Sequence, residues 1–255
     1  MQIAAGRIVV QRYDFLHDDA SVEGLVVRPV GSEAMPGLVL IPGYSRTAYD
    51  LLPVAVRFAR AGFATLSVSQ PGFGGSTGPA DFSGPRTFAA VRAAAQRFAA
   101  EPYVDPTRLG VYGYSRGALA AAQLATRTDL FKAAVLGGGI YDFAAAYRQV
   151  RLPGIRANMV EEAGMTEEAA RFRSPIHDVE GLDGPVLIIH AADDLNAPPE
   201  QARALADRLQ KLGRSHELMI IAGRTHALSI NDIATPAVDF FQRHLSTGMV
   251  ARATN

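Results

Sequence analysis

The chain has 255 residues, of which 48% are hydrophobic, enough for one large α/β domain with a substantial core. Its 25 basic and 25 acidic residues cancel and form no long run, so the charge pattern gives no indication of a nucleic-acid partner or an anionic membrane. The absence of cysteine excludes disulfides, thiolate catalysis and cysteine metal sites. The start of the sequence has no signal-peptide pattern and no run reaches a transmembrane length, so we expect a cytoplasmic protein.

The first part of the chain predicts the edge of a sheet. Two β-rich segments at 7–13 and 23–30 are joined by a polar turn at 18–21, which indicates a hairpin. The continuously apolar run at 37–41 is typical of a strand buried on both faces of a parallel sheet. Residues 48–61 then carry an apolar stripe at helical spacing.

A glycine-rich loop at 69–78 follows a predicted strand at 63–68. It lacks the lysine of a phosphate-binding P-loop, and its glycines do not fit the spacing of a dinucleotide-binding turn. We therefore expect no nucleotide site there. An alanine-rich helix over 83–100, a loop at 103–107 and a strand at 109–112 come next.

The second half of the chain alternates regularly between strands and helices. Strands are predicted at 133–136, 185–191 and 217–222, and helices at 199–212 and 230–245. Such alternation predicts a mostly parallel, eight-stranded sheet with helices on both faces, in one domain over the whole chain. Catalytic residues in this fold class lie in loops at the carboxyl ends of the strands.

The sequence GYSRG at residues 113–117 lies between a predicted strand and an alanine-rich helix, as in a nucleophile elbow. We expect side chains two residues on either side of the serine to collide with it in so sharp a turn, which Gly113 and Gly117 avoid. Ser115 would project above the N-terminus of the helix, where developing negative charge is favoured. The pattern predicts that Ser115 is a nucleophile.

The partners that such a serine needs follow other strands. Asp193 and Asp194 come after the strand at 185–191, and His226 comes after the last strand. A serine hydroxyl requires a base, and imidazole, with an unperturbed pKa of about 6.5, suits that role. A buried carboxylate then orients the imidazole.

The chain resembles the α/β-hydrolase superfamily over nearly its whole length, and most of all the catalytic domains of prolyl-oligopeptidase-like and dienelactone-hydrolase-like members. Residues 190–198 (HAADDLNAP) resemble the family pattern H-G-x-x-D-x-x-V-P. This resemblance implies that Asp194 is the acid and His226 the base, with Asp193 and Asp142 as the alternative acids. It also implies that His190 is structural.

The sequence departs from the family pattern in two places, the glycine-rich loop and the loop that would bind the oxyanion. The glycine-rich loop resembles the family's D-x-R-G-x-G-x-S-x-G, with Gln70 and Pro71 in place of the usual residues. In prolyl-oligopeptidase-like peptidases a tyrosine hydroxyl helps to bind the oxyanion at the position of Pro42, which has no donor. The resemblance therefore implies that the oxyanion donors are the backbone N–H groups of Tyr44 and Arg116.

Residues 142–184 interrupt the alternation, at the place where members of this family carry a small cap over the active site. A plain crossover helix with long loops is the alternative. In this segment, Pro153 and Gly154 are predicted to end a first helix, and Thr166 to start another. If the segment is a cap, we expect Phe143, Tyr147, Ile155 and Met159 to line an apolar acyl or alcohol pocket. We also expect Tyr44 to line the pocket, because its loop must approach Ser115.

The sequence thus predicts a serine hydrolase that cleaves carboxylic esters of small molecules through an acyl-enzyme, without a cofactor or metal. Two observations favour an esterase over a peptidase: Pro42, and a chain length that leaves no room for the β-propeller of the oligopeptidases. Serine in place of cysteine in the elbow argues against a dienelactone hydrolase proper. An aminopeptidase or thioesterase using the same residues is the first alternative. A non-catalytic binding protein, a C–C bond hydrolase and a cofactor-free haloperoxidase are the others. The side chain of Arg116 either meets a substrate carboxylate or forms a structural salt bridge. Nothing in the sequence indicates the oligomeric state.

Overall fold

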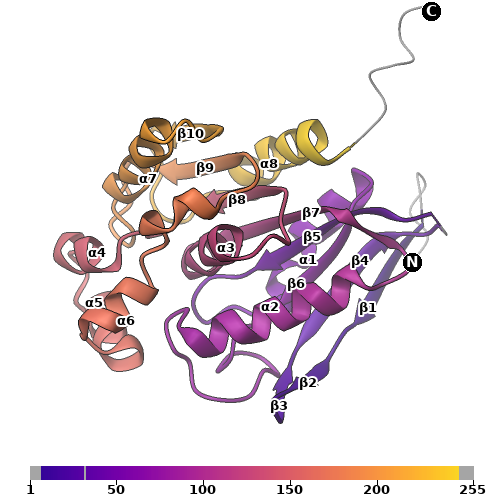
Figure 1. Cartoon of the computed structure of the whole chain (residues 1–255), viewed down its shortest axis with the longest axis horizontal. Coiled ribbons are helices and arrows are strands. Elements are labelled where there is room, and N and C mark those ends of the chain that lie inside the picture. The colour runs from indigo at the N-terminus through magenta and orange to yellow at the C-terminus, as the bar shows by residue number, and fades with distance from the viewer. Residues whose placement is uncertain (1–6, 32, 247–255) are drawn as a thin grey trace, which may run out of the picture.

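A computed structural model of the chain describes residues 7–31 and 33–246, and its centre is one eight-stranded sheet (Figure 1). In spatial order the strands are β1 (Ile8–Arg12), β4 (Gly24–Pro29), β6 (Ala64–Val68), β5 (Met35–Ile41), β7 (Val104–Tyr114), β8 (Ala133–Gly137), β9 (Val186–Ala191) and β10 (His216–Ile221). The β1–β4 and β4–β6 pairs are antiparallel, and all other neighbours are parallel. The predicted α/β-hydrolase fold is therefore confirmed.

Helices cover both faces of the sheet. Successive residues of the central strands point to opposite faces, and both sets are apolar, so each face must be buried. In β5, Leu38 and Leu40 pack against one group of helices, whereas Val39 and Ile41 pack against the other. The first group is α1 (Leu52–Arg60), preceded by the short helix η1 (Ala48–Leu51), and α8 (Ile230–Leu245). The second group is α2 (Pro85–Ala99), α3 (Arg116–Arg127) and α7 (Glu200–Lys211).

The edge of the sheet differs in one detail from the prediction. β1 and β4 pair as expected, but the connection between them forms a small separate sheet of β2 (Phe15–His17) and β3 (Ala20–Val22). Asp18 and Asp19 make its two-residue turn with φ of 47° and 63°. Positive φ at both central positions suits a hairpin turn, and aspartate tolerates it better than most residues.

The strand that leads to the elbow is longer than predicted. β7 begins at Val104, so the predicted loop at 103–107 is mostly strand. Val104 and Asp105 pair with Met35 and Pro36 of β5, and the register then shifts so that Gly37 pairs with Leu109. The polar composition concealed this pairing because three residues of β7 itself, Pro106 to Arg108, bulge out of the ladder and interrupt its apolar periodicity.

Residues 142–184 form a group of short helices, α4 (Phe143–Gln149), α5 (Pro153–Asn158), the π-helical turn η2 (Met159–Ala163), α6 (Glu167–Phe172), η3 (Pro175–His177) and η4 (Val179–Gly181). Figure 1 shows α4, α5 and α6 together at one end of the molecule. The prediction that Pro153 and Gly154 end a helix is wrong, because Pro153 occupies the first position of α5, where its missing N–H costs nothing. Thr166 caps α6 by accepting a hydrogen bond from the N–H of Ala169, as predicted.

None of the helices in the described residues combines the length and the apolar composition needed to cross a lipid bilayer.

Candidate active site

The turn between β7 and α3 is strained at Ser115, whose φ of 56° and ψ of −122° lie outside the usual regions. Both flanking glycines are required, although for a different reason from the predicted collision with the serine. A Cβ at Gly113 would lie 2.2 Å from the carbonyl oxygen of Gly117, and one at Gly117 would lie 2.1 Å from the carbonyl oxygen of Ile41. The glycines therefore let the elbow fold upon itself and pack against the end of β5.

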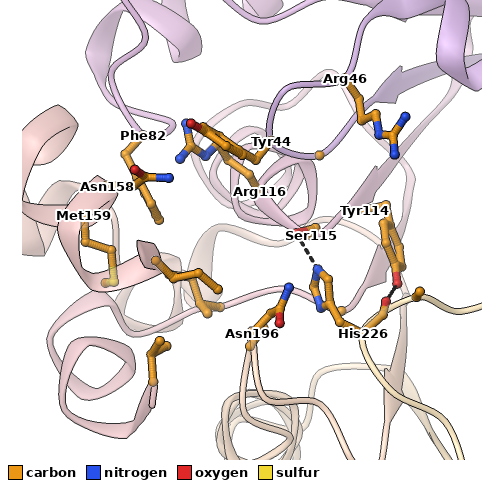
Figure 2. Close-up of a pocket in the computed structure, with 17 residues that line it drawn as sticks. Tyr44, Arg46, Phe82, Tyr114, Ser115, Arg116, Asn158, Met159, Asn196 and His226 are labelled. Carbon is orange, nitrogen blue, oxygen red and sulfur yellow. Dashed lines mark hydrogen bonds between the residues drawn. The ribbon is translucent and has the colours of Figure 1, made fainter. Parts of the chain in front are cut away.

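Ser115, His226 and Asp194 form a continuous chain of hydrogen bonds. Nε2 of His226 lies 2.8 Å from Oγ of Ser115, and Nδ1 of His226 lies 2.7 Å from Oδ2 of Asp194. Figure 2 shows His226 pointing its ring toward Ser115. The three residues follow β7, β9 and β10, whose carboxyl ends lie at the same edge of the sheet.

Asp194 is held as a carboxylate. Its side chain is 1% exposed, and Oδ1 accepts hydrogen bonds from the N–H groups of Asn196 and Ala197, both at 2.9 Å. Burial by itself would raise the pKa of Asp194, but the hydrogen bonds from His190 and His226 outweigh it and lower the pKa far below its usual range. An ionised carboxylate in this place fixes which nitrogen of His226 carries the proton.

The alternative acids and the second histidine lie elsewhere. The Asp193 side chain is exposed to solvent. Asp142 caps α4, where its Oδ1 accepts the N–H of Ala145 at 2.9 Å. His190 is fully buried, with Nε2 2.7 Å from the carbonyl oxygen of Ala197, so it holds the loop that carries Asp194.

Sequence reasoning missed Tyr114, which supports the loop that carries His226. Its hydroxyl donates a hydrogen bond to the carbonyl oxygen of His226 and accepts one from the N–H of Leu228 at 3.2 Å (Figure 2). Burial raises the pKa of Tyr114 to about 12, so the hydroxyl keeps its proton. In the sequence, the only indication of this role was that Tyr114 directly precedes Ser115, at the first variable position of the G-x-S-x-G motif.

The loop after β5 passes directly beside the serine. A Cβ at Gly43 would lie 3.2 Å from Cβ of Ser115. In the described part of the chain, neither the N–H of Tyr44 nor that of Arg116 has a hydrogen-bond partner. Two free donors beside a serine can bind a developing oxyanion.

Two buried side chains of the glycine-rich loop hold that neighbouring segment in place. Nε2 of Gln70 donates to the carbonyl oxygen of Pro42 at 2.7 Å, and Oγ of Ser69 accepts the N–H of Ala48 at 2.7 Å. Gln70, which departs from the family pattern, therefore has a structural role next to the predicted oxyanion donors.

A cavity of about 440 Å³ adjoins Ser115 and His226. Tyr44, Ile155 and Met159, which the sequence predicts as substrate-binding residues, line this cavity. Sequence reasoning missed other lining residues, which include Phe82, Ile140, Val150, Asn158, Asn196 and Ala197. Most of this wall is apolar, and residues 150–159 supply four of its lining residues, Val150, Ile155, Asn158 and Met159.

Phe143 and Tyr147 do not line this cavity, which corrects the prediction. Phe143 is fully buried behind the wall, with its ring centroid 5.5 Å from that of Phe82. Tyr147 lies on another surface of the helical group, next to Arg156, whose guanidinium is 4.6 Å from the tyrosine ring. Phe143 and Ala146 of α4 thus pack in an apolar cluster that includes Leu119 of α3, instead of lining the cavity.

We found no cluster of three or more His, Asp or Glu side chains that could hold a metal ion among the residues that the structure describes.

Residues 82–248 match the model of the prolyl oligopeptidase family. The uncharacterized peptidase YuxL of Bacillus subtilis is 26% identical over 228 residues, which cover 83% of this chain and 34% of YuxL. The esterase YjfP of Escherichia coli is 25% identical over 249 residues, which cover 89% of this chain and 96% of YjfP.

Among solved structures, the Pyrococcus horikoshii acylaminoacyl peptidase superposes with a TM-score of 0.81 at 22% identity, covering 93% of this chain and 42% of the peptidase. This level of identity supports the fold. The chain spans about a third of the length of YuxL and less than half of the acylaminoacyl peptidase.

Proposed function

Because this chain belongs to the prolyl oligopeptidase family, we propose that it is a serine hydrolase that cleaves small carboxylic esters through an acyl-enzyme. Family membership agrees with the resemblance seen in the sequence motifs. The single observation that carries the proposal is the hydrogen-bonded chain from Ser115 through His226 to Asp194, beside an open cavity. This arrangement has a nucleophile, a base and an orienting acid in contact.

In the proposed reaction, Oγ of Ser115 attacks the ester carbonyl carbon while its proton passes to Nε2 of His226. The carbonyl oxygen becomes an oxyanion that accepts hydrogen bonds from the N–H groups of Tyr44 and Arg116. His226 then gives the proton to the departing alcohol, which leaves an acyl group on Ser115. A water molecule, deprotonated by His226, attacks the acyl carbon, and the proton returns to Ser115 as the carboxylic acid leaves.

We propose that the helices within 142–184 act as a cap that shapes the acyl site. Val150, Ile155 and Met159 come from this segment and face the same cavity as Ser115. A mostly apolar wall around about 440 Å³ suits an apolar acyl or alcohol group of modest size.

Two observations support an ester rather than an amide as the substrate. Pro42 lacks the side-chain donor that peptidase relatives place in the oxyanion loop. In addition, YjfP, which matches along nearly all of its length, is described as an esterase. A peptidase with the same three residues is the second candidate, favoured by the names of YuxL and the acylaminoacyl peptidase.

The choice between these candidates can be measured directly. We expect kcat/KM for nitrophenyl butyrate and for the unactivated ethyl butyrate to lie well above kcat/KM for aminoacyl and acylaminoacyl nitroanilides. Ser115→Ala is the control that separates enzymatic from spontaneous hydrolysis. Cleavage of any of the anilides with a kcat/KM equal to or above that of the esters would assign the protein to the peptidases.

A further inference from the structure

Arg116 places a cation at the wall of the acyl cavity. It is 7% exposed and lines the cavity immediately after the nucleophile. Its guanidinium lies 4.4 Å from the ring centroid of Tyr44 and 4.2 Å from that of Phe82, and Figure 2 shows these three side chains close together. An unpaired arginine in such a place would attract a carboxylate on the substrate.

Glu162 neutralises this cation from the other side. Its Oε2 lies 2.6 Å from Nη1 of Arg116 and also accepts the N–H of Phe82 at 3.0 Å. The side chains of the pair are 5% and 13% exposed. Since Glu162 belongs to η2, the ion pair joins the cap to the residue that follows the nucleophile.

The other charged side chains near Arg116 and at the cavity rim interact with groups other than Arg116. Buried Arg173 donates to the carbonyl oxygens of Asp81 and Phe82, while the carboxylate of Asp81 accepts bonds at the start of α2. At the cavity rim, the Arg46 side chain is largely exposed and lies 3.4 Å from a carboxylate oxygen of Asp50. Within the described residues, Glu162 is the carboxylate that forms an ion pair with Arg116.

We propose that Glu162 is a specificity-determining residue, which makes the acyl cavity select uncharged acyl groups against acyl groups that carry a carboxylate. The inference deepens the proposed function and rests on it. A substrate carboxylate near Arg116 would lie close to the carboxylate of Glu162, and like charges repel strongly where burial lowers the dielectric constant. A neutral acyl group leaves the ion pair intact and meets no such repulsion.

The test compares an anionic and a neutral substrate of the same size. These are the nitrophenyl half-esters of adipic and suberic acid, each paired with its terminal carboxamide. The readout is the ratio of kcat/KM for the acid to kcat/KM for the amide. We expect this ratio to be well below one in the wild-type protein and to rise by about tenfold or more in Glu162→Gln, which frees Arg116 to bind the carboxylate.

Glu161→Gln is the matched control, since it removes the same charge from the adjacent, exposed position. We expect it to change the ratio less than about twofold, because an exposed charge is screened by solvent. The double variant Arg116→Met with Glu162→Gln should lose the gain for the acid, because the cation that attracts the carboxylate is gone. Each ratio is internal to one preparation, so a loss of folded protein does not alter it.

The same substrate pairs titrated into Ser115→Ala forms of each variant give the ratio of dissociation constants without turnover. Absence of ester hydrolysis by the wild-type protein would overturn the proposed function, whereas this binding ratio would still test Glu162. An unchanged ratio in Glu162→Gln for both chain lengths, or an equal rise in Glu161→Gln, would overturn the inference.

Discussion

Asp193 and Asp194 are neighbours in the sequence but lie in opposite environments. Asp194 is buried, bonded to His226 and held ionised by its hydrogen-bond donors, whereas Asp193 is exposed. A side chain that is free in water influences His226 only through a screened field. The two carboxylates therefore differ in what they can do, although the sequence alone separates them only through a family motif.

Replacement of each by its amide tests this difference. Asp194→Asn should lower kcat by about 10³- to 10⁴-fold with little change in KM, because the amide favours the wrong imidazole tautomer. Asp193→Asn is the matched control and should lower kcat less than about tenfold. Both are measured on one ester near pH 8. Loss of activity in Asp193→Asn instead would move the acid by one residue, and full activity in both would leave Asp142 as the candidate.

For single residues, the sequence predicted the location of site residues in loops after strands better than the location of those on helices. Ser115, Asp194 and His226 could be found because strand ends converge at one edge of a parallel sheet. Phe143 and Tyr147 were misplaced because the direction in which a short helix presents its apolar stripe depends on its neighbours. Glu162 gave no local signal, because its partner Arg116 lies 46 residues away along the chain.

The elbow is the element whose local geometry is most constrained. Gly117 meets the backbone at the end of β5 and just after it, because a Cβ there would lie 2.1 Å from the carbonyl oxygen of Ile41 and 2.6 Å from that of Pro42. Backbone atoms in a central strand cannot move aside as the end of a flexible side chain can. The contact between the elbow and β5 therefore leaves no room for a side chain at Gly117.

Gly117→Ala should consequently reduce the free energy of unfolding by about 3 kcal/mol or more, as overpacking of a well-filled interior does. Gly154→Ala is the control, because a Cβ at that position in α5 meets nothing within 4 Å. It should be neutral or stabilise by up to about 1 kcal/mol, since alanine favours a helix. Chemical denaturation measures both, and equal effects of the two substitutions would contradict this account of the elbow.

Most elements were predictable where local pattern and tertiary role agree. The apolar runs of β5 and β9 and the striped helices α1, α7 and α8 are examples of such agreement. The start of β7 was not predictable, because Val104 and Asp105 extend the strand only through their pairing with Met35 and Pro36 of β5. The role of Pro153 could not be predicted, since a proline can lie just after the end of one helix or in the first turn of the next.

On the scale of the whole molecule, the parallel sheet brings residues that are far apart in the sequence together in one site. His226 is 111 residues from Ser115 and 32 from Asp194, yet it bonds to both. The helices within 142–184 enter between β8 and β9, and part of this segment lines the cavity beside Ser115. The central claim for the molecule is that these parts work together as an acyl-transfer site with Ser115 as the nucleophile.

Covalent labelling of the intact protein tests that claim most directly. A fluorophosphonate reacts with a serine that is activated by an adjacent base, so we expect one adduct on the peptide that contains Ser115, identified by mass spectrometry. Ser115→Ala should remain folded, take no label and lose at least about 10⁴-fold in kcat on the best ester. A label on another residue, or full ester turnover by Ser115→Ala, would contradict the account.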